Sequence, residues 1–150
     1  MATRKGRVRA LTQASARKKA TFGELSKLGL AEAAPLARAA RASPEALAGL
    51  ADRGYSEQEI FELVVPKRTL ARRLAANDLL TIEETDKALR LERVAALAQR
   101  VFGDPAKAHR WLRKPKDRLG GDTPMAFLAS EHGARIVEEM LHQIQHGMFA

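Results

Sequence analysis

The chain has 150 residues, which is enough for one domain or for two small domains that share a core. It has no cysteine, which excludes a disulfide scaffold, a thiolate metal site and a cysteine nucleophile. Its net charge of +8 and isoelectric point near 10.3 indicate a polyanionic partner. No stretch approaches the roughly 18 apolar residues of a membrane span. No secretory signal follows the basic N-terminus, so we expect a cytoplasmic protein without a membrane partner.

The composition predicts an all-α fold. Alanine and the aliphatic residues supply nearly all of the hydrophobicity, and aromatic residues make up only 5% of the chain. Alanine and leucine lose little on entering a helix. Alternating runs of Val, Ile and Thr, which would indicate strands, are absent from the sequence.

Charge is distributed unevenly along the chain. Residues 1–19 contain seven basic residues and no acidic one, so residues 1–20 are expected to form a flexible basic arm. From residue 119 to the end, one basic residue, Arg135, stands against four acidic ones. The two ends of the chain are therefore expected to bind different partners.

The predicted helices of the first half begin and end at clear signals. Residues 21–41 suit one or two short helices, interrupted by glycine and proline. A helix is expected from Pro44, capped by Ser43, to about residue 54. Ser56 with a glutamate three residues later is a capping box for a short second helix. Pro66 ends that helix and opens another that runs to about residue 77.

The second half follows the same logic. A capping box at Thr81 starts the longest helix, residues 82–101, which is expected to bridge the two halves. A helix over residues 105–112 and a loop over 113–122 follow. In that loop we interpret Gly120 and Gly121 as allowing the next helix, 123–128, to pack closely. An amphipathic helix over residues 131–146 ends at Gly147.

The two short helices before and after Pro66 are compatible with a helix-turn-helix. On a helical wheel Leu70 and Leu74 form an apolar stripe that would hold the second helix, and basic side chains occupy the other side. Such donors suit guanine edges and phosphates, although the same pattern is common on a solvated face. The candidate DNA-binding residues are Lys67, Arg68, Thr69, Arg72 and Arg73.

A series of blocks between about residues 55 and 150 resembles one known family in order and spacing. The blocks are PKRTLARRL at 66–74, LTIEETDKALRL at 80–91, VFGD at 101–104, Ala108 with Trp111 and Leu112, LGGDTP at 119–124 and GARIVE at 133–138. Together they resemble the Xre/MbcA/ParS antitoxins, the partners of RES-domain toxins. Thr85, Lys87 and the basic run at 113–116 depart from the usual pattern and leave the toxin specificity open.

The resemblance implies an all-α protein with an Xre-like helix-turn-helix DNA-binding region over residues 21–80 and a helical toxin-binding domain over 81–150. It also implies a homodimer within a larger toxin–antitoxin complex, and autoregulation of the operon through operator DNA. The cognate RES toxin is implied to act on NAD. That chemistry belongs to the toxin, so we expect no enzymatic activity and no cofactor in this chain.

The C-terminal helix and tail are the expected site of toxin neutralisation. An apolar Met-Phe pair on a free terminus either folds back onto the core or is given to a partner, where it would cover the toxin's active site. Arg135 is alternatively a local ion-pair residue. The candidate toxin-binding residues are Leu119, Gly120, Gly121, Arg135, Glu139, His142, His146, Met148 and Phe149.

Two other interpretations are weaker. His142 and His146 lie one helical turn apart near Glu138 and Glu139, but a zinc site needs a third ligand and a di-iron site needs a second Glu-x-x-His motif. We therefore expect no metal and no catalytic site. The alternative function is a stand-alone DNA-binding regulator whose second half only dimerises, and the acidic C-terminal end argues against it.

Overall fold

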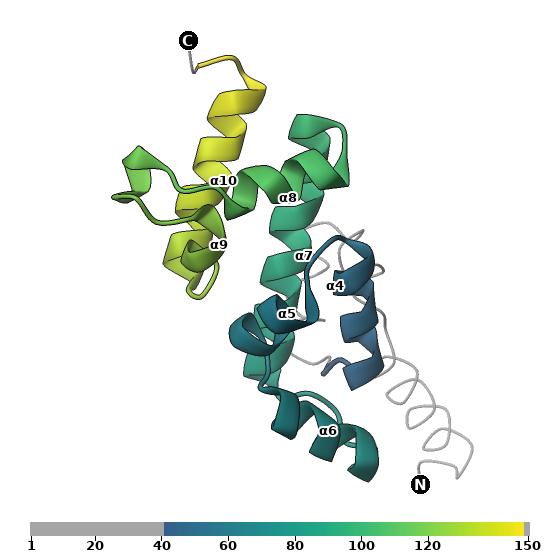
Figure 1. Ribbon diagram of the computed structural model, residues 1–150. Coiled ribbons are helices and arrows are strands. Elements are labelled where there is room, and N and C mark those ends of the chain that lie inside the picture. Colours follow the sequence, from purple (N-terminus) through teal and green to yellow (C-terminus); the bar gives the residue numbers. More distant parts are fainter. Residues whose placement is uncertain (1–40, 149–150) are drawn as a thin grey trace, which may run out of the picture.

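The computed structural model describes residues 41–148, and every regular element in this range is a helix, which confirms the all-α class (Figure 1). The predicted basic arm, the predicted helices before residue 41, and Phe149 lie outside the described residues. The elements in chain order are η1 (Pro44–Leu47), α4 (Ala48–Asp52), α5 (Glu57–Leu63), α6 (Lys67–Ala76), α7 (Ile82–Phe102), α8 (Pro105–Arg113), η2 (Asp117–Leu119), α9 (Pro124–Phe127) and α10 (Glu131–Gln145).

Both predicted capping boxes are present. The Ser56 hydroxyl accepts the Glu59 backbone N–H at 3.2 Å, and the Glu59 carboxylate accepts the Ser56 N–H at 2.8 Å. At the start of α7 the Thr81 hydroxyl and the Glu84 carboxylate make the same exchange at 3.1 and 2.8 Å. Each box satisfies N–H groups that a helix leaves without an internal partner, which is why these two boundaries were readable from the sequence.

Two local predictions were wrong in detail. The first helix begins as the 3₁₀ turn η1, and the side chain of Ser43 makes no capping hydrogen bond. The backbone carbonyl of Ser43 instead accepts the Ala46 N–H at 3.0 Å, so the free amide is satisfied without the hydroxyl. The expected loop at residues 113–122 also contains a short helix, η2.

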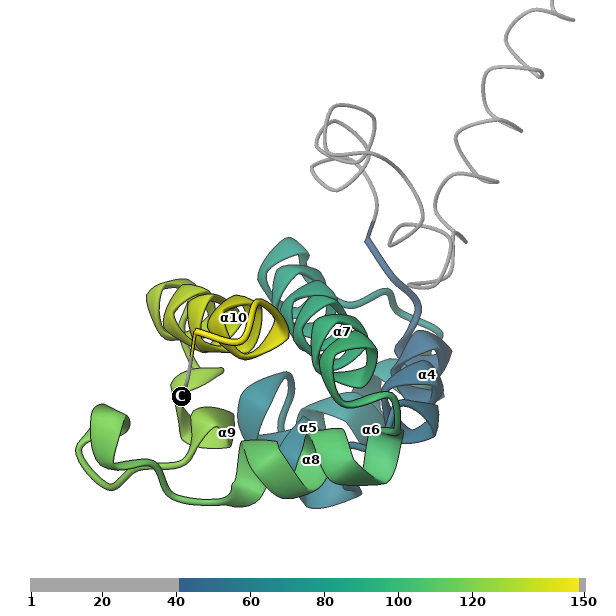
Figure 2. The same cartoon turned by 90° about the horizontal axis from the view of Figure 1, so that it is seen from above.

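Helix α7 runs through the middle of the molecule, and the other elements pack around it (Figures 1 and 2). Figure 2 shows α10 lying alongside it, and α8 and α4 also contact it. Within α7, Val94 and Leu97 are buried and Leu89 and Val101 are half-buried.

One hydrophobic core spans both predicted halves. Leu50, Val65 and Leu80 from the first half belong to the same cluster as Leu112 and Leu141 from the second. The expected functional boundary near residue 80 therefore coincides with the start of α7 but does not separate two cores. Of the helices within residues 41–148, none combines the length and apolar character needed to cross a membrane.

Candidate partner-binding surfaces

The α5–α6 pair has the helix, tight turn and helix expected from the sequence. Val64 and Val65 in the turn are buried, and they anchor the corner between the two helices to the core. Pro66 caps α6 with an extended backbone. Figure 1 shows α6 at the end of the molecule opposite the C-terminus of α10, so the two candidate surfaces lie far apart.

The five candidate DNA-binding residues differ in their surroundings. The side chains of Lys67, Arg68 and Arg72 are exposed, whereas Thr69 is half-buried. Arg73 is half-buried as well, and its guanidinium lies 3.0 Å from the Glu84 carboxylate of α7. Three basic side chains of α6 are therefore available to a polyanion, and the charge of Arg73 is used inside the chain.

The expected apolar stripe of α6 is only half formed. Leu70 packs against the core, but 47% of Leu74 is exposed, and α6 has no buried residue. Polar contacts hold this end of the molecule together instead. The Arg41 guanidinium donates to the carbonyls of Leu79 and Leu80 at 3.1 and 2.7 Å, which fixes the connection from α6 to α7.

A group of residues joins α8 to the first helix of the α5–α6 pair, and we call it the α5–α8 contact: Gly54, Tyr55, Glu59, His109 and Arg113. The Arg113 guanidinium donates to both carboxylate oxygens of Glu59, at 2.7 and 2.9 Å, and to the Gly54 carbonyl at 2.9 Å. Burial acts to raise the pKa of Glu59, but the hydrogen bonds from Arg113 and from the Ser56 N–H, with the Arg113 charge, together hold this pKa below its usual value.

The His109 ring lies in the middle of the α5–α8 contact. His109 is only 3% exposed. Its ring meets the Tyr55 ring edge-on, with 4.7 Å between the two ring centroids. Burial, and then the Arg113 charge, lower the pKa of His109, so the neutral imidazole is favoured. Gly54 has φ near +110°, and a Cβ there would lie 2.6 Å from the His109 ring. Only glycine fits this approach.

A partly buried ion pair adds to the connection between the halves. Glu92 on α7 is only 3% exposed, whereas the Arg53 side chain is 36% exposed. The Glu92 Oε1 accepts a hydrogen bond from Arg53 Nε at 2.8 Å and lies 2.6 Å from a second nitrogen of this guanidinium. The Tyr55 hydroxyl donates to the Leu91 carbonyl at 2.7 Å. These contacts were not foreseen, because the residues they join lie 39 and 36 positions apart in the sequence.

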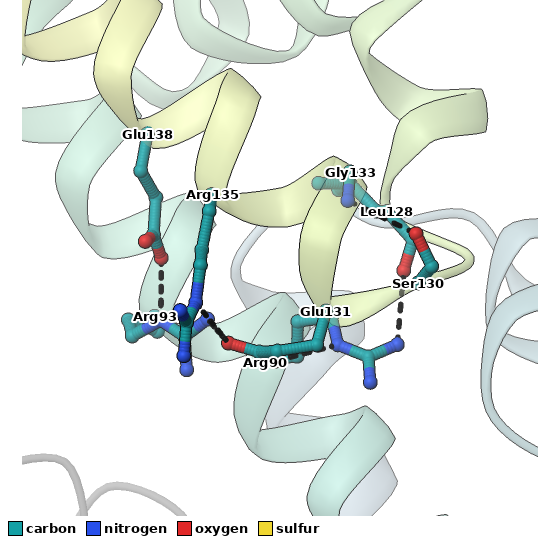
Figure 3. Close-up of polar contacts among 8 residues, drawn as sticks. All are labelled: Arg90, Arg93, Leu128, Ser130, Glu131, Gly133, Arg135 and Glu138. Atoms are coloured by element: carbon teal, nitrogen blue, oxygen red, sulfur yellow. Dashed lines mark hydrogen bonds and ion pairs between the residues drawn. The ribbon is translucent and has the colours of Figure 1, made fainter.

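Two acidic residues of α10, Glu131 and Glu138, face α7 rather than a partner. Figure 3 shows Glu131 between Arg90 and Arg93, with Glu138 against Arg93. Glu131 lies 3.1 Å from Arg90 and 2.8 Å from Arg93. Burial acts to raise the pKa of Glu131, but the two arginines outweigh it and lower this pKa. Arg90 and Arg93 lie three residues apart on α7, and Glu131 and Glu138 lie seven apart on α10, so each pair shares one helix face.

The outward face of α10 carries four of the candidate toxin-binding residues. Arg135, Glu139, His142 and His146 are all exposed. The side chain of Arg135 is 75% exposed and lies 3.9 Å from Glu131 within its own helix. A hollow of about 310 Å³ opens beside this face, and its lining residues are Arg118, His132, Arg135, Ile136, Glu139 and Met140.

Leu119 is buried, and the reason expected for Gly120 and Gly121 was wrong. A Cβ at either glycine would meet no atom within 4 Å, so close packing does not require them. Glycine is required at both positions by the backbone, because their φ values of +68° and +90° are ones that L-residues rarely adopt. The close approach occurs at Gly133 instead, where a Cβ would lie 2.0 Å from the Phe127 carbonyl oxygen.

The C-terminal tail leaves α10 after Gly147, whose φ of +66° confirms it as the helix stop. The side chain of Met148 is 67% exposed and is not folded back onto the core. Among residues 41–148, no group of three or more His, Asp and Glu side chains is arranged to hold a metal ion.

The chain is similar in sequence to one protein-family model and to several known proteins. Residues 97–147 match the model of the antitoxin Xre/MbcA/ParS C-terminal toxin-binding domain. The chain is 42% identical to the antitoxin Xre of Pseudomonas putida over 101 residues, or 67% of this chain and 64% of that protein. It is 34% identical to the antitoxin Xre of Yersinia enterocolitica over 87 residues, covering 57% of this chain and 59% of that protein. A "Prs ADP-ribosylating antitoxin" of a Sphingobium species is 30% identical over 91 residues, covering 55% and 57%. The chain thus spans less than two thirds of the length of each of these relatives.

Proposed function

The chain belongs to the Xre/MbcA/ParS antitoxin family, and from this premise we propose that it binds and neutralises a protein toxin through residues 97–147. The observation that carries this proposal is the match of that segment to a toxin-binding domain. In the structure the segment comprises the end of α7, α8, η2, α9 and α10. Helices α8 and α10 pack on α7, and the outward face of α10 stays exposed to a partner.

We propose a cognate RES-domain toxin that acts on NAD, as the resemblance implies. The antitoxin would act by covering the toxin's active site with α10 and the tail from Met148 onward, and not by chemistry of its own. Both proteins would act in the cytoplasm. The exposed side chain of Met148 supports a role of the tail in the complex, because an apolar group left in water gains from burial in a partner.

The test of toxin binding is co-expression of this chain with the RES-domain protein encoded beside it. We expect a stable complex in which the toxin no longer consumes NAD, and growth of cells that the toxin alone would arrest. A truncation after residue 146 should weaken neutralisation. The absence of any complex, with the chain folded, would contradict the proposal and favour a stand-alone regulator.

We also propose that the α5–α6 pair binds operator DNA, with Lys67, Arg68 and Arg72 as the contacts. Exposure of these three side chains on one end of the molecule supports it, since long cationic donors reach phosphates and guanine edges. A homodimer would place two such helices on a two-fold operator, and the mass of the DNA complex tests this arrangement.

The DNA test uses a triple variant, K67Q/R68Q/R72Q, and a control, Arg100→Gln, whose side chain is exposed at the far end of α7. Each lost phosphate contact lowers the slope of affinity against salt by about 1. We expect the triple variant to bind operator DNA at least ~10-fold more weakly at physiological salt, with a shallower slope. Equal affinity and slope for the triple variant and the control would place DNA binding elsewhere.

A further inference from the structure

The hollow between η2 and α10 has an apolar floor and a charged rim. Ile136 is half-buried and Met140 is 6% exposed, so their side chains form a floor anchored in the fold. Arg118, His132, Arg135 and Glu139 stand around it. Arg118 donates to the Gln143 side-chain oxygen at 3.0 Å, a contact that orients its guanidinium at the rim.

The charge at this rim is the opposite of what the sequence suggests. The segment from residue 119 onward is acidic in composition. Glu131 and Glu138, however, are matched by Arg90 and Arg93 on the α7 side, as Figure 3 shows. The hollow itself is rimmed by two arginines and one glutamate. A protein that approaches this face therefore meets more arginine than carboxylate side chains around an apolar floor.

We propose that this hollow is the socket of the toxin interface, and that it takes an apolar side chain of the toxin flanked by a carboxylate. The proposal rests on the proposed toxin binding and adds the place and the chemistry of the contact. An apolar side chain buried in a preformed pocket is the usual anchor of a protein interface. The planar guanidinium of arginine binds a carboxylate through two parallel hydrogen bonds, which lysine cannot do.

Three observations support the toxin over another occupant. The hollow lies wholly within residues 97–147, the segment that matches a toxin-binding domain. The acidic side chains of α10 that could repel a carboxylate are paired to α7, apart from Glu139. The rim arginines stand on two different elements, η2 and α10, so one carboxylate can be held from two sides.

The decisive experiment measures the affinity of the full chain for the purified RES-domain toxin with charge-reversal variants. Arg135→Glu and the double variant R118E/R135E should bind the toxin at least ~10-fold more weakly, because they place like charges against the expected carboxylate. Arg110→Glu is the matched control, since Arg110 is an exposed arginine on α8 outside the hollow. It should bind within ~3-fold of the unaltered chain. The loss in R135E should also shrink as salt is raised.

The outcomes separate the two proposals. If the unaltered chain does not bind the toxin, the proposed function fails. If it binds and R118E/R135E binds equally well, the function stands and the socket is wrong. If the double variant unfolds at a lower temperature, the toxin affinity of R135E alone tests the socket. The Arg135 side chain is 75% exposed, so its substitution disturbs the fold little. A change in the oligomeric state of the free chain, with toxin affinity unchanged, would assign the hollow to a second copy and overturn the proposal.

Discussion

Helices α6 and α10 both look amphipathic in the sequence, but the structure uses them differently. Helix α10 buries five residues, among them Val137, Met140 and Leu141, and is held to α7 by ion pairs. Helix α6 buries none and leaves Leu74 47% exposed. One helix is part of the core and offers only its outer face, whereas the other stands at the edge of the molecule and offers most of its surface.

The difference matches what the two proposed partners require. A helix that reads DNA must enter a groove about 12 Å wide, so it needs side chains free on most of its surface. A helix that presents a protein-binding face needs a rigid support behind it. The α5–α8 contact and the Arg53–Glu92 pair then join the two regions, so that they form one folded unit.

The largest effect should separate the two helices directly. Leu141 on α10 is fully buried, and Leu141→Ala removes core contacts and leaves a cavity, which costs about 2–5 kcal/mol. Leu74→Ala on α6 is the matched truncation and should change stability by less than about 0.5 kcal/mol. Chemical denaturation measures both. A comparable loss in the two variants would show that α6 is a core helix after all.

The next effect concerns the close approach of α10 to the preceding turn. Gly133→Ala places a Cβ 2.0 Å from a backbone oxygen of Phe127, which cannot move aside as a side chain would. We expect the free energy of unfolding to fall by about 3 kcal/mol and toxin binding to become weaker.

The control for this variant is Gly49→Ala. Gly49 lies in α4 with ordinary helical backbone, and a Cβ there would meet nothing within 4 Å. The substitution should raise stability by up to about 1 kcal/mol, since alanine is the better helix former. A similar loss of stability in both variants would mean that the contact with Phe127 is not the reason why position 133 requires glycine.

A smaller effect distinguishes the two adjacent arginines of α6. Arg73 and Glu84 have side chains that are each 14% exposed, so Arg73→Gln leaves a half-buried carboxylate without its partner and should cost about 1–2 kcal/mol. Arg72→Gln, at an exposed position, should change stability by less than about 0.5 kcal/mol but weaken DNA binding. Thermal unfolding and DNA titration of the two variants should give opposite rankings. The same ranking in both would contradict the division of roles.

The smallest effect is a pH dependence that comes from the α5–α8 contact. The pKa of His109 in the folded chain lies below the 6.5 of a free histidine, chiefly because the ring is buried. As pH falls below 6.5, the unfolded chain binds the proton first, so stability decreases until the folded-state pKa is reached. Glu59 and Arg113 are the charged groups that face the ring.

The measurement is the free energy of unfolding between pH 7 and 5 for the chain and for His109→Leu. The slope should be steeper in the unaltered chain, because the variant has no group there to titrate. Below this window the lowered pKa values of Glu59 and Glu131 add a further loss, as their ion pairs are protonated. Equal slopes in both proteins would show that His109 takes up its proton without disturbing the contact.

Much of the local structure follows from short-range chemistry. The starts of α5 and α7 were predictable because a capping box lies within four residues, and the end of α10 because Gly147 adopts a left-handed conformation. Hydrogen bonds and backbone preferences of this kind depend only on neighbours in the chain. The all-α class and the basic face of α6 followed in the same way.

The parts that could not be predicted all depend on residues far apart in the sequence. The acidic C-terminal end was interpreted as a surface for a partner, but Arg90 and Arg93, about 40 positions away, pair with Glu131 and Glu138 and leave Glu139 of the α10 acids outside these ion pairs. Gly120 and Gly133 were indistinguishable until the packing of Phe127 was known.

The sequence by itself determined the main helices, the two capping boxes and the family, because these depend on local patterns and on the order of short blocks. Only the tertiary structure decided which charges are paired, which apolar faces are buried and where the hollow opens. Charge and hydrophobicity act through space, and a single sequence does not state which distant side chains will meet.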